Sequence, residues 1–103
     1  MNDYRVRFSA TSSNPPAPDA ASRLAAALAG MPGTNGVEET TQDRRRRRVA
    51  AVFWIQVRLG MADAARDGSR LAKEALKVAG MGDAQLVELA VTMQRRPPAP
   101  AGA

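Results

Sequence analysis

The segment that most constrains the fold is residues 47–59, which reads RRVAAVFWIQVRL. Alternate side chains of a β-strand point to opposite faces of its sheet. One face of this segment carries Val49, Ala51, Phe53, Ile55 and Val57, and the other carries Ala50, Val52, Trp54, Gln56 and Arg58. Both faces are apolar in the middle, which is typical of a strand with neighbours on each side. The segment therefore predicts a central strand of a sheet.

Three further segments have strand-like patterns. Residues 4–10 alternate strictly, with Tyr4, Val6, Phe8 and Ala10 predicted inward and Arg5, Arg7 and Ser9 outward. Residues 86–93 are predicted to turn Val87, Leu89, Val91 and Met93 inward and Leu86, Glu88, Ala90 and Thr92 outward. Residues 37–42 predict a weaker strand, in which Glu39 would share the inward face with Val37. An inward charge is tolerated at a sheet edge, so this strand is expected there.

Two segments predict helices. Residues 19–31 are rich in alanine, and Gly30, Pro32 and Gly33 are expected to end that helix. Residues 62–79 carry an apolar stripe that includes Ala64, Gly68, Leu71, Ala75 and Val78, with Asp63 expected as the cap and Gly80 as the end. A glycine inside a helix lowers helix stability by about 1 kcal/mol relative to alanine, and Gly68 is expected to allow close approach to the sheet.

The predicted order is strand, helix, strand, strand, helix, strand, and the tripeptide Ala-Gly-Met closes both helices, at residues 29–31 and 79–81. Two interleaved βαβ units of this kind resemble the ferredoxin-like (split βαβ, βαββαβ) fold. The resemblance implies an α+β fold with a four-stranded antiparallel sheet of order 4-1-3-2 and two helices on one face. We expect a single domain over residues 1–94 and a disordered Pro/Ala-rich tail over residues 95–103.

The charge of the chain is concentrated in one run. Fifteen Lys and Arg face ten Asp and Glu, which gives +5. The excess equals the five consecutive arginines Arg44, Arg45, Arg46, Arg47 and Arg48. The run falls between two predicted strands, so it predicts a basic hairpin tip. Guanidinium groups bind phosphate oxygens bidentately, and we expect an anionic partner, with nucleic acid first. An acidic protein or anionic lipid also fits, and so does a solvated loop without a partner.

The uncovered face of the sheet is the second candidate surface. Its predicted residues are Arg5, Arg7, Val52, Trp54, Gln56, Leu86 and Glu88. Burying an exposed indole contributes about 2 kcal/mol or more, which favours a homodimer formed through this face. Arg5 or Arg7 is expected to pair with Glu88 on the neighbouring strand. The topology is also similar to that of RNA-recognition domains, but only Trp54 is placed to stack on a base, because Arg5, Arg7 and Ser9 stand where that family presents an aromatic residue.

Catalytic and metal-binding patterns are weak. The chain has no Cys and no His, which removes disulfides, thiolate chemistry and the commonest general base. No cofactor, metal or catalytic residue is predicted, although a ligand-binding or cofactor-independent enzymatic dimeric α+β barrel is an alternative. We expect no membrane span and a cytoplasmic location. Abundant Ala and Arg with only two Lys suggests a GC-rich bacterial or phage source.

The sequence thus favours a small non-enzymatic binding or adaptor protein that uses a basic hairpin. An accessory or structural subunit of a larger assembly, docking by the hairpin and a sheet edge, is a further alternative.

Overall fold

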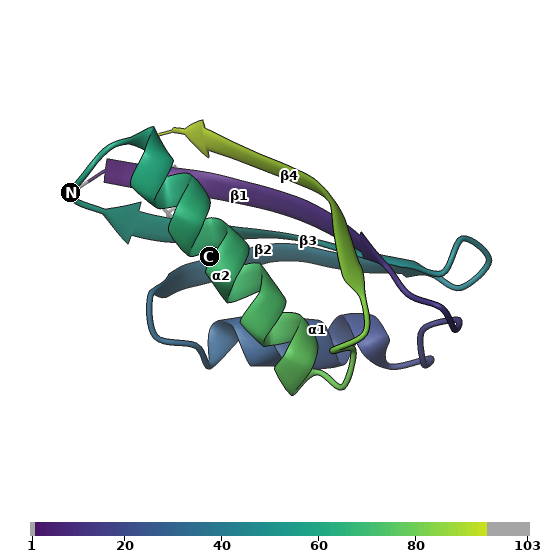
Figure 1. The fold of residues 1–103 in the computed structure, drawn as a ribbon. Coiled ribbons are helices and arrows are strands. Elements are labelled where there is room, and N and C mark those ends of the chain that lie inside the picture. Colours follow the sequence, from purple (N-terminus) through teal and green to yellow (C-terminus); the bar gives the residue numbers. More distant parts are fainter. Residues whose placement is uncertain (1, 95–103) are drawn as a thin grey trace.

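The computed structural model describes residues 2–94, so the predicted tail at 95–103 lies outside the described residues. The chain forms an α+β fold (Figure 1). Its elements are β1 (Asn2–Thr11), α1 (Ala20–Ala29), β2 (Thr34–Asp43), β3 (Arg48–Val57), α2 (Met61–Val78) and β4 (Gln85–Met93). The sheet is antiparallel with the order β2-β3-β1-β4. The predicted element order, the sheet order and the central position of β3 are confirmed.

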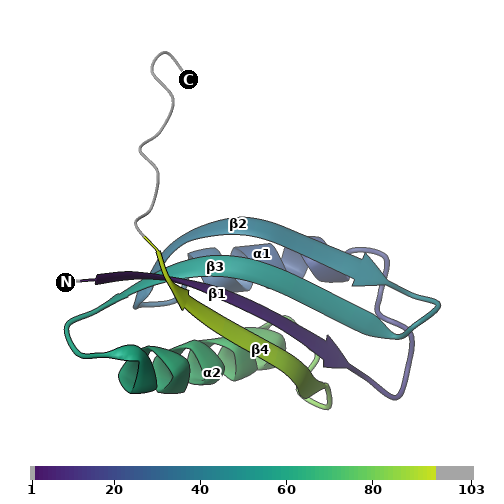
Figure 2. The ribbon, with the colours of Figure 1, turned by 90° about the horizontal axis from the view of Figure 1, so that it is seen from above.

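Both helices lie on the same side of the sheet (Figure 2). The core joins them to one face of the two central strands, and its largest fully buried side chains are Tyr4, Val6, Phe8, Leu24, Leu28, Phe53, Ile55 and Leu71. The rings of Phe8 and Phe53 meet edge to face, with their centroids 6.0 Å apart. The strict alternation of β1 and β3 therefore predicted their inward faces correctly.

The two Ala-Gly-Met repeats end their helices with different geometry. After α2, Gly80 has a φ of 84°, and its N–H donates to the carbonyl of Lys77 at 3.1 Å. The N–H of Met81 donates to the carbonyl of Leu76 at 2.7 Å, which completes a Schellman motif. After α1, Gly30 keeps a right-handed φ of −86°. The shared tripeptide is thus a repeat of sequence without a repeat of backbone conformation.

Helix α1 receives its N-terminal cap from another element. Asp19 at the N-cap makes no side-chain capping hydrogen bond. Instead, Gln42 on β2 accepts a hydrogen bond from the N–H of Ala21 at its Oε1 and donates from its Nε2 to the carbonyl of Ala17, both at 2.8 Å. The side chain of Gln42 thus satisfies one of the N–H groups that a helix start leaves without an intrahelical acceptor.

Two register shifts overturn predicted side-chain directions. On β4, Glu88 lies opposite Ser9 but Leu86 lies opposite Ala10, so Val87 is an extra residue that reverses the alternation. The prediction that Leu86 faces outward is therefore wrong, because its side chain packs against the core. Val87, which was predicted to point inward, is 52% exposed.

The second shift lies on β2, between Val37 and Glu39. Val37 packs against the core, as predicted. Glu39 instead lines a small cavity with Arg5 and Arg7 of β1, on the face away from the helices. The expectation that Glu39 shares the inward face of Val37 is wrong because the bulge at Glu38 turns the strand over.

Candidate anion-binding hairpin and open sheet face

The arginine hairpin, which we define as residues 43–48, connects β2 to β3. Residues 44–47 form the turn, and Asp43 lies opposite Arg48 at its base. Asp43 Oδ1 accepts a hydrogen bond from the N–H of Arg46 at 3.1 Å, and the N–H of Arg47 donates to the carbonyl of Arg44 at 3.3 Å. The turn protrudes from one end of the sheet (Figure 1). The strand patterns predict this turn near residues 43–45, and the observed turn lies one to two residues further along the chain.

Arg47 anchors the arginine hairpin to the loop between β1 and α1. Its Nη1 donates to the carbonyl of Ser13 at 2.9 Å, and its own carbonyl accepts from the N–H of Ser12 at 3.0 Å. The φ of Arg47 is 54°, a left-handed conformation that is uncommon outside glycine. One of the five arginines therefore has a structural role within the fold.

The remaining arginines differ in how far they are neutralised. All five are exposed, and Arg46 lies 3.8 Å from the carboxylate of Asp43. Arg44, Arg45 and Arg48 form no ion pair with any residue that the structure describes. Three guanidinium groups of the arginine hairpin therefore stay available to an anionic ligand, and the backbone of the hairpin is held by Asp43 and by the loop before α1.

The open sheet face is the face away from the helices. There the side chain of Arg5 extends from β1 across β3 and binds Glu38 of β2. Its Nε and Nη2 donate to Oε2 of Glu38 on β2, at 3.0 and 2.6 Å. Arg5 lies on β1 opposite Trp54, so the ion pair passes over β3. The expected pairing of Arg5 or Arg7 with Glu88 is not among the ion pairs of the described residues, and the residue opposite Glu88 is Ser9.

Trp54 is buried within a single chain. It lies between Phe53 and Ile55, which belong to the core, so the alternation places its side chain on the open sheet face. The exposed fraction is nevertheless 4% for Trp54 and 6% for Val52. We attribute this shielding in part to the crossing of Arg5 to Glu38. The premise that an exposed indole needs a second copy to cover it is therefore wrong.

Six of the seven residues predicted for the open sheet face lie there, and Leu86 does not. Gln56 is exposed and donates from its Nε2 to Oδ1 of Asp3 at 2.8 Å. The cavity on this face measures about 180 Å³ and is lined by Arg5, Arg7, Glu39, Thr41, Ala50, Ala51 and Val52. Small-molecule sites usually measure roughly 300–1,000 Å³. The cavity on the open sheet face is therefore smaller than most small-molecule sites.

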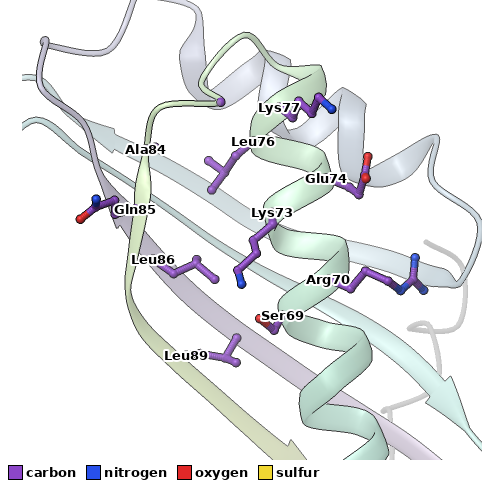
Figure 3. A pocket seen from close by; sticks show the side chains of 11 residues that line it. Ser69, Arg70, Lys73, Glu74, Leu76, Lys77, Ala84, Gln85, Leu86 and Leu89 are labelled. Carbon is purple, nitrogen blue, oxygen red and sulfur yellow. The ribbon is translucent and has the colours of Figure 1, made fainter.

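A larger groove, of about 900 Å³, lies between α2 and β4 (Figure 3). Leu76, Leu86 and Leu89 supply its apolar part, and Lys73 extends into it from α2. The sequence interpretation missed this groove because it placed Leu86 on the other side of the sheet. The signal in the sequence that could have revealed the groove is the presence of basic residues on α2 together with large apolar residues on β4.

Comparison of the sequence with protein-family models and with curated proteins found no match. Within residues 2–94, no group of three acidic residues is placed to hold a metal ion. No helix of the described chain is long and apolar enough to cross a membrane.

Proposed function

We propose that the protein is a small binding protein of ferredoxin-like topology whose arginine hairpin contacts the phosphates of a nucleic acid. The proposal includes the expected cytoplasmic location, because nucleic acid is present in the cytoplasm. Its βαββαβ element order and its β2-β3-β1-β4 sheet order support the ferredoxin-like assignment.

The observation that carries the proposal is the set of three exposed guanidinium groups, on Arg44, Arg45 and Arg48, that have no acidic partner among residues 2–94. Like charges held this close repel one another, and an anionic ligand removes that repulsion. Guanidinium groups match the geometry of phosphate oxygens, and nucleic acid presents phosphates as a closely spaced line. A phosphate backbone is thus the ligand that fits this cluster best.

Burial of Trp54 bears on the mode of binding. Recognition of single strands by stacking needs an accessible aromatic face, and the indole is 4% exposed. Binding through the arginine hairpin would then involve the backbone and little base reading. We expect similar affinity for duplexes of different sequence, with a steep dependence on salt.

Fluorescence anisotropy with labelled duplex and single-stranded DNA tests the proposal. The variant R44A/R45A removes two unpaired cations from the turn. We expect about a 10-fold loss of affinity at low salt, which corresponds to ~1.4 kcal/mol. The slope of log K against log salt should become shallower by about 1.8, since each phosphate contact with duplex contributes about 0.9.

The matched control is R58A/R66A, which removes the same charge. Both residues are exposed, and they lie where β3 ends and α2 begins, at the opposite end of the sheet from the arginine hairpin (Figure 1). This control should keep most of the affinity. Equal losses in the two variants would mean that net charge alone drives binding. Unchanged binding by R44A/R45A would reject the hairpin as the site.

A further inference from the structure

Among the strands that the structure describes, β4 pairs with β1 alone, so it forms one edge of the sheet. Within Gln85–Met93 the only charged residue is Glu88, and the strand contains neither Lys nor Pro. Three of its large apolar side chains are exposed, with exposed fractions of 52% for Val87, 37% for Leu89 and 62% for Met93. A long apolar edge of this kind is a template for pairing with another strand.

The opposite edge of the sheet is protected. Strand β2 carries three acidic residues, Glu38, Glu39 and Asp43, and its register with β3 shifts twice. Charges and bulges of this kind discourage strand addition. The two edges of one sheet therefore differ in the feature that controls association, and β4 is the edge open to a partner.

The backbone hydrogen bonds show which residues of β4 face the open edge. The N–H of Gln94 donates to the carbonyl of Asp3, so Gln94 turns its backbone toward β1. Because successive residues of a strand point their backbone groups in opposite directions, Leu89, Val91 and Met93 direct their N–H and C=O groups away from β1. These three residues are the backbone donors and acceptors that an added strand would use.

We propose that β4 pairs antiparallel with β4 of a second copy of this chain, about a two-fold axis at Val91. This register places Leu89 opposite Met93 of the partner subunit and Val91 opposite its own equivalent. Each such pair exchanges two backbone hydrogen bonds. The arrangement is isologous and closes on itself, as a symmetric dimer requires.

The side chains match this register on both faces of the sheet. On the helix side, Leu89 of one copy lies opposite Met93 of the other copy. Directly opposite residues have Cβ atoms about 4.5–5.5 Å apart, so both side chains bury apolar surface. On the open sheet face, Ala90 lies opposite Thr92, and Glu88 lies opposite Gln94. No like charges of the described residues meet, and the exposed side chains of Leu89 and Met93 cover one another across the two copies. A second copy therefore fits this edge.

The dimer does not depend on the nucleic-acid proposal, and it differs from a dimer through the Trp54 face. Sedimentation equilibrium of the full chain at micromolar concentration measures it directly. We expect twice the 10.9 kDa of one chain. The variant L89K/M93K sets two cations against two cations in the proposed register and should weaken the dimer at least 10-fold, whereas L89K/M93E sets each cation beside a carboxylate and should retain it.

The matched control is L59K/V78K, which also replaces two apolar residues that are each 66% exposed, neither of them on β4. It should remain dimeric, and circular dichroism of each variant establishes that the chain is folded. A monomeric wild type overturns the proposal. So does a dimer that L89K/M93K leaves intact, or one that L89K/M93E disrupts as strongly as L89K/M93K does. Mass that rises beyond the dimer would contradict the closed two-fold pairing.

Discussion

Gly68 lies where α2 comes closest to the sheet. A Cβ atom at this position would lie 3.1 and 3.2 Å from the two methyl groups of Val6 and 3.7 Å from a methyl of Val91. Val6 is fully buried beneath the helix, so its side chain has little room to move. The contact explains why a residue that weakens a helix stands in the middle of α2.

We expect Gly68→Ala to lower the free energy of unfolding by about 1 kcal/mol. Alanine favours the helix by ~1 kcal/mol, but overpacking a dense core costs typically 1–3 kcal/mol, and the clash should outweigh the propensity. Urea denaturation measures the difference. In Val6→Ala the methyl groups are gone, so the same Gly68→Ala change should become neutral or stabilising.

Ser69→Ala is the control for the effect of an added helix former, since Ser69 is the next residue along α2 and is half-buried. It should change stability by less than about 0.5 kcal/mol. If Gly68→Ala raised stability while Val6 is present, the close approach of α2 to Val6 would not be the reason for glycine at position 68.

Helix α1 depends on a strand for its start, because Gln42 of β2 supplies the acceptor that Asp19 does not. The contact joins residues that are 21 positions apart, and it links the position of α1 to the strand that leads into the arginine hairpin. An element that looks self-contained in the sequence is thus completed by its neighbour.

Replacing Gln42 by Ala should lower the free energy of unfolding by about 1 kcal/mol, the usual size of a lost N-terminal cap. Gln42→Glu keeps an acceptor oxygen and places a negative charge at the helix start, where it is favourable, so its loss should be smaller. Thermal unfolding of the two variants measures both effects. Equal losses would show that the donation to Ala17, which both variants remove, is the contribution that matters.

Patterns within one strand predicted the elements and many of their faces. The alternation in β1 and β3 gave the correct inward residues because period two follows directly from strand geometry. The bulges at Glu38 and Val87 depend on pairing between strands, and a single strand's pattern does not record them. For that reason Leu86 and Glu39 were assigned to the wrong faces, and the groove between α2 and β4 was missed.

In the candidate site, too, the features set by local sequence patterns were predicted, and those set by contacts between distant segments were not. The position of the five arginines at a hairpin tip followed from their place between two strand patterns. The pairing of Arg5 with Glu38 and the anchoring of Arg47 by Ser13 join segments far apart in the chain. Burial of Trp54 is set by such contacts, so local pattern alone predicted it exposed.

At the scale of the whole molecule, the net charge of +5 equals the number of arginines in one run, and that run lies at one end of the sheet. The rest of the chain is balanced between ten cationic and ten anionic side chains. Electrostatic repulsion is thus concentrated among the arginines of the hairpin. In the free protein, Arg44, Arg45 and Arg48 have no acidic partner among the described residues.

The variant R44A/R45A should therefore be slightly more stable than the wild type at low salt, by about 0.5 kcal/mol, the scale of exposed charge interactions. The difference should fade at high salt, because added ions screen exposed charges. Urea denaturation at two salt concentrations checks this. Lower stability at low salt would mean that these arginines have partners that stabilise the fold.

The hydrogen bond between Arg47 and Ser13 affects the entropy that is lost when the arginine hairpin binds a ligand. A free basic tail gives up conformational freedom when a ligand orders it, and that loss subtracts from affinity. Here the loop before α1 already restrains the guanidinium-bearing turn, so most of the ordering has taken place during folding. Complex formation should proceed by nearly rigid docking, with little change in the backbone dynamics of the turn.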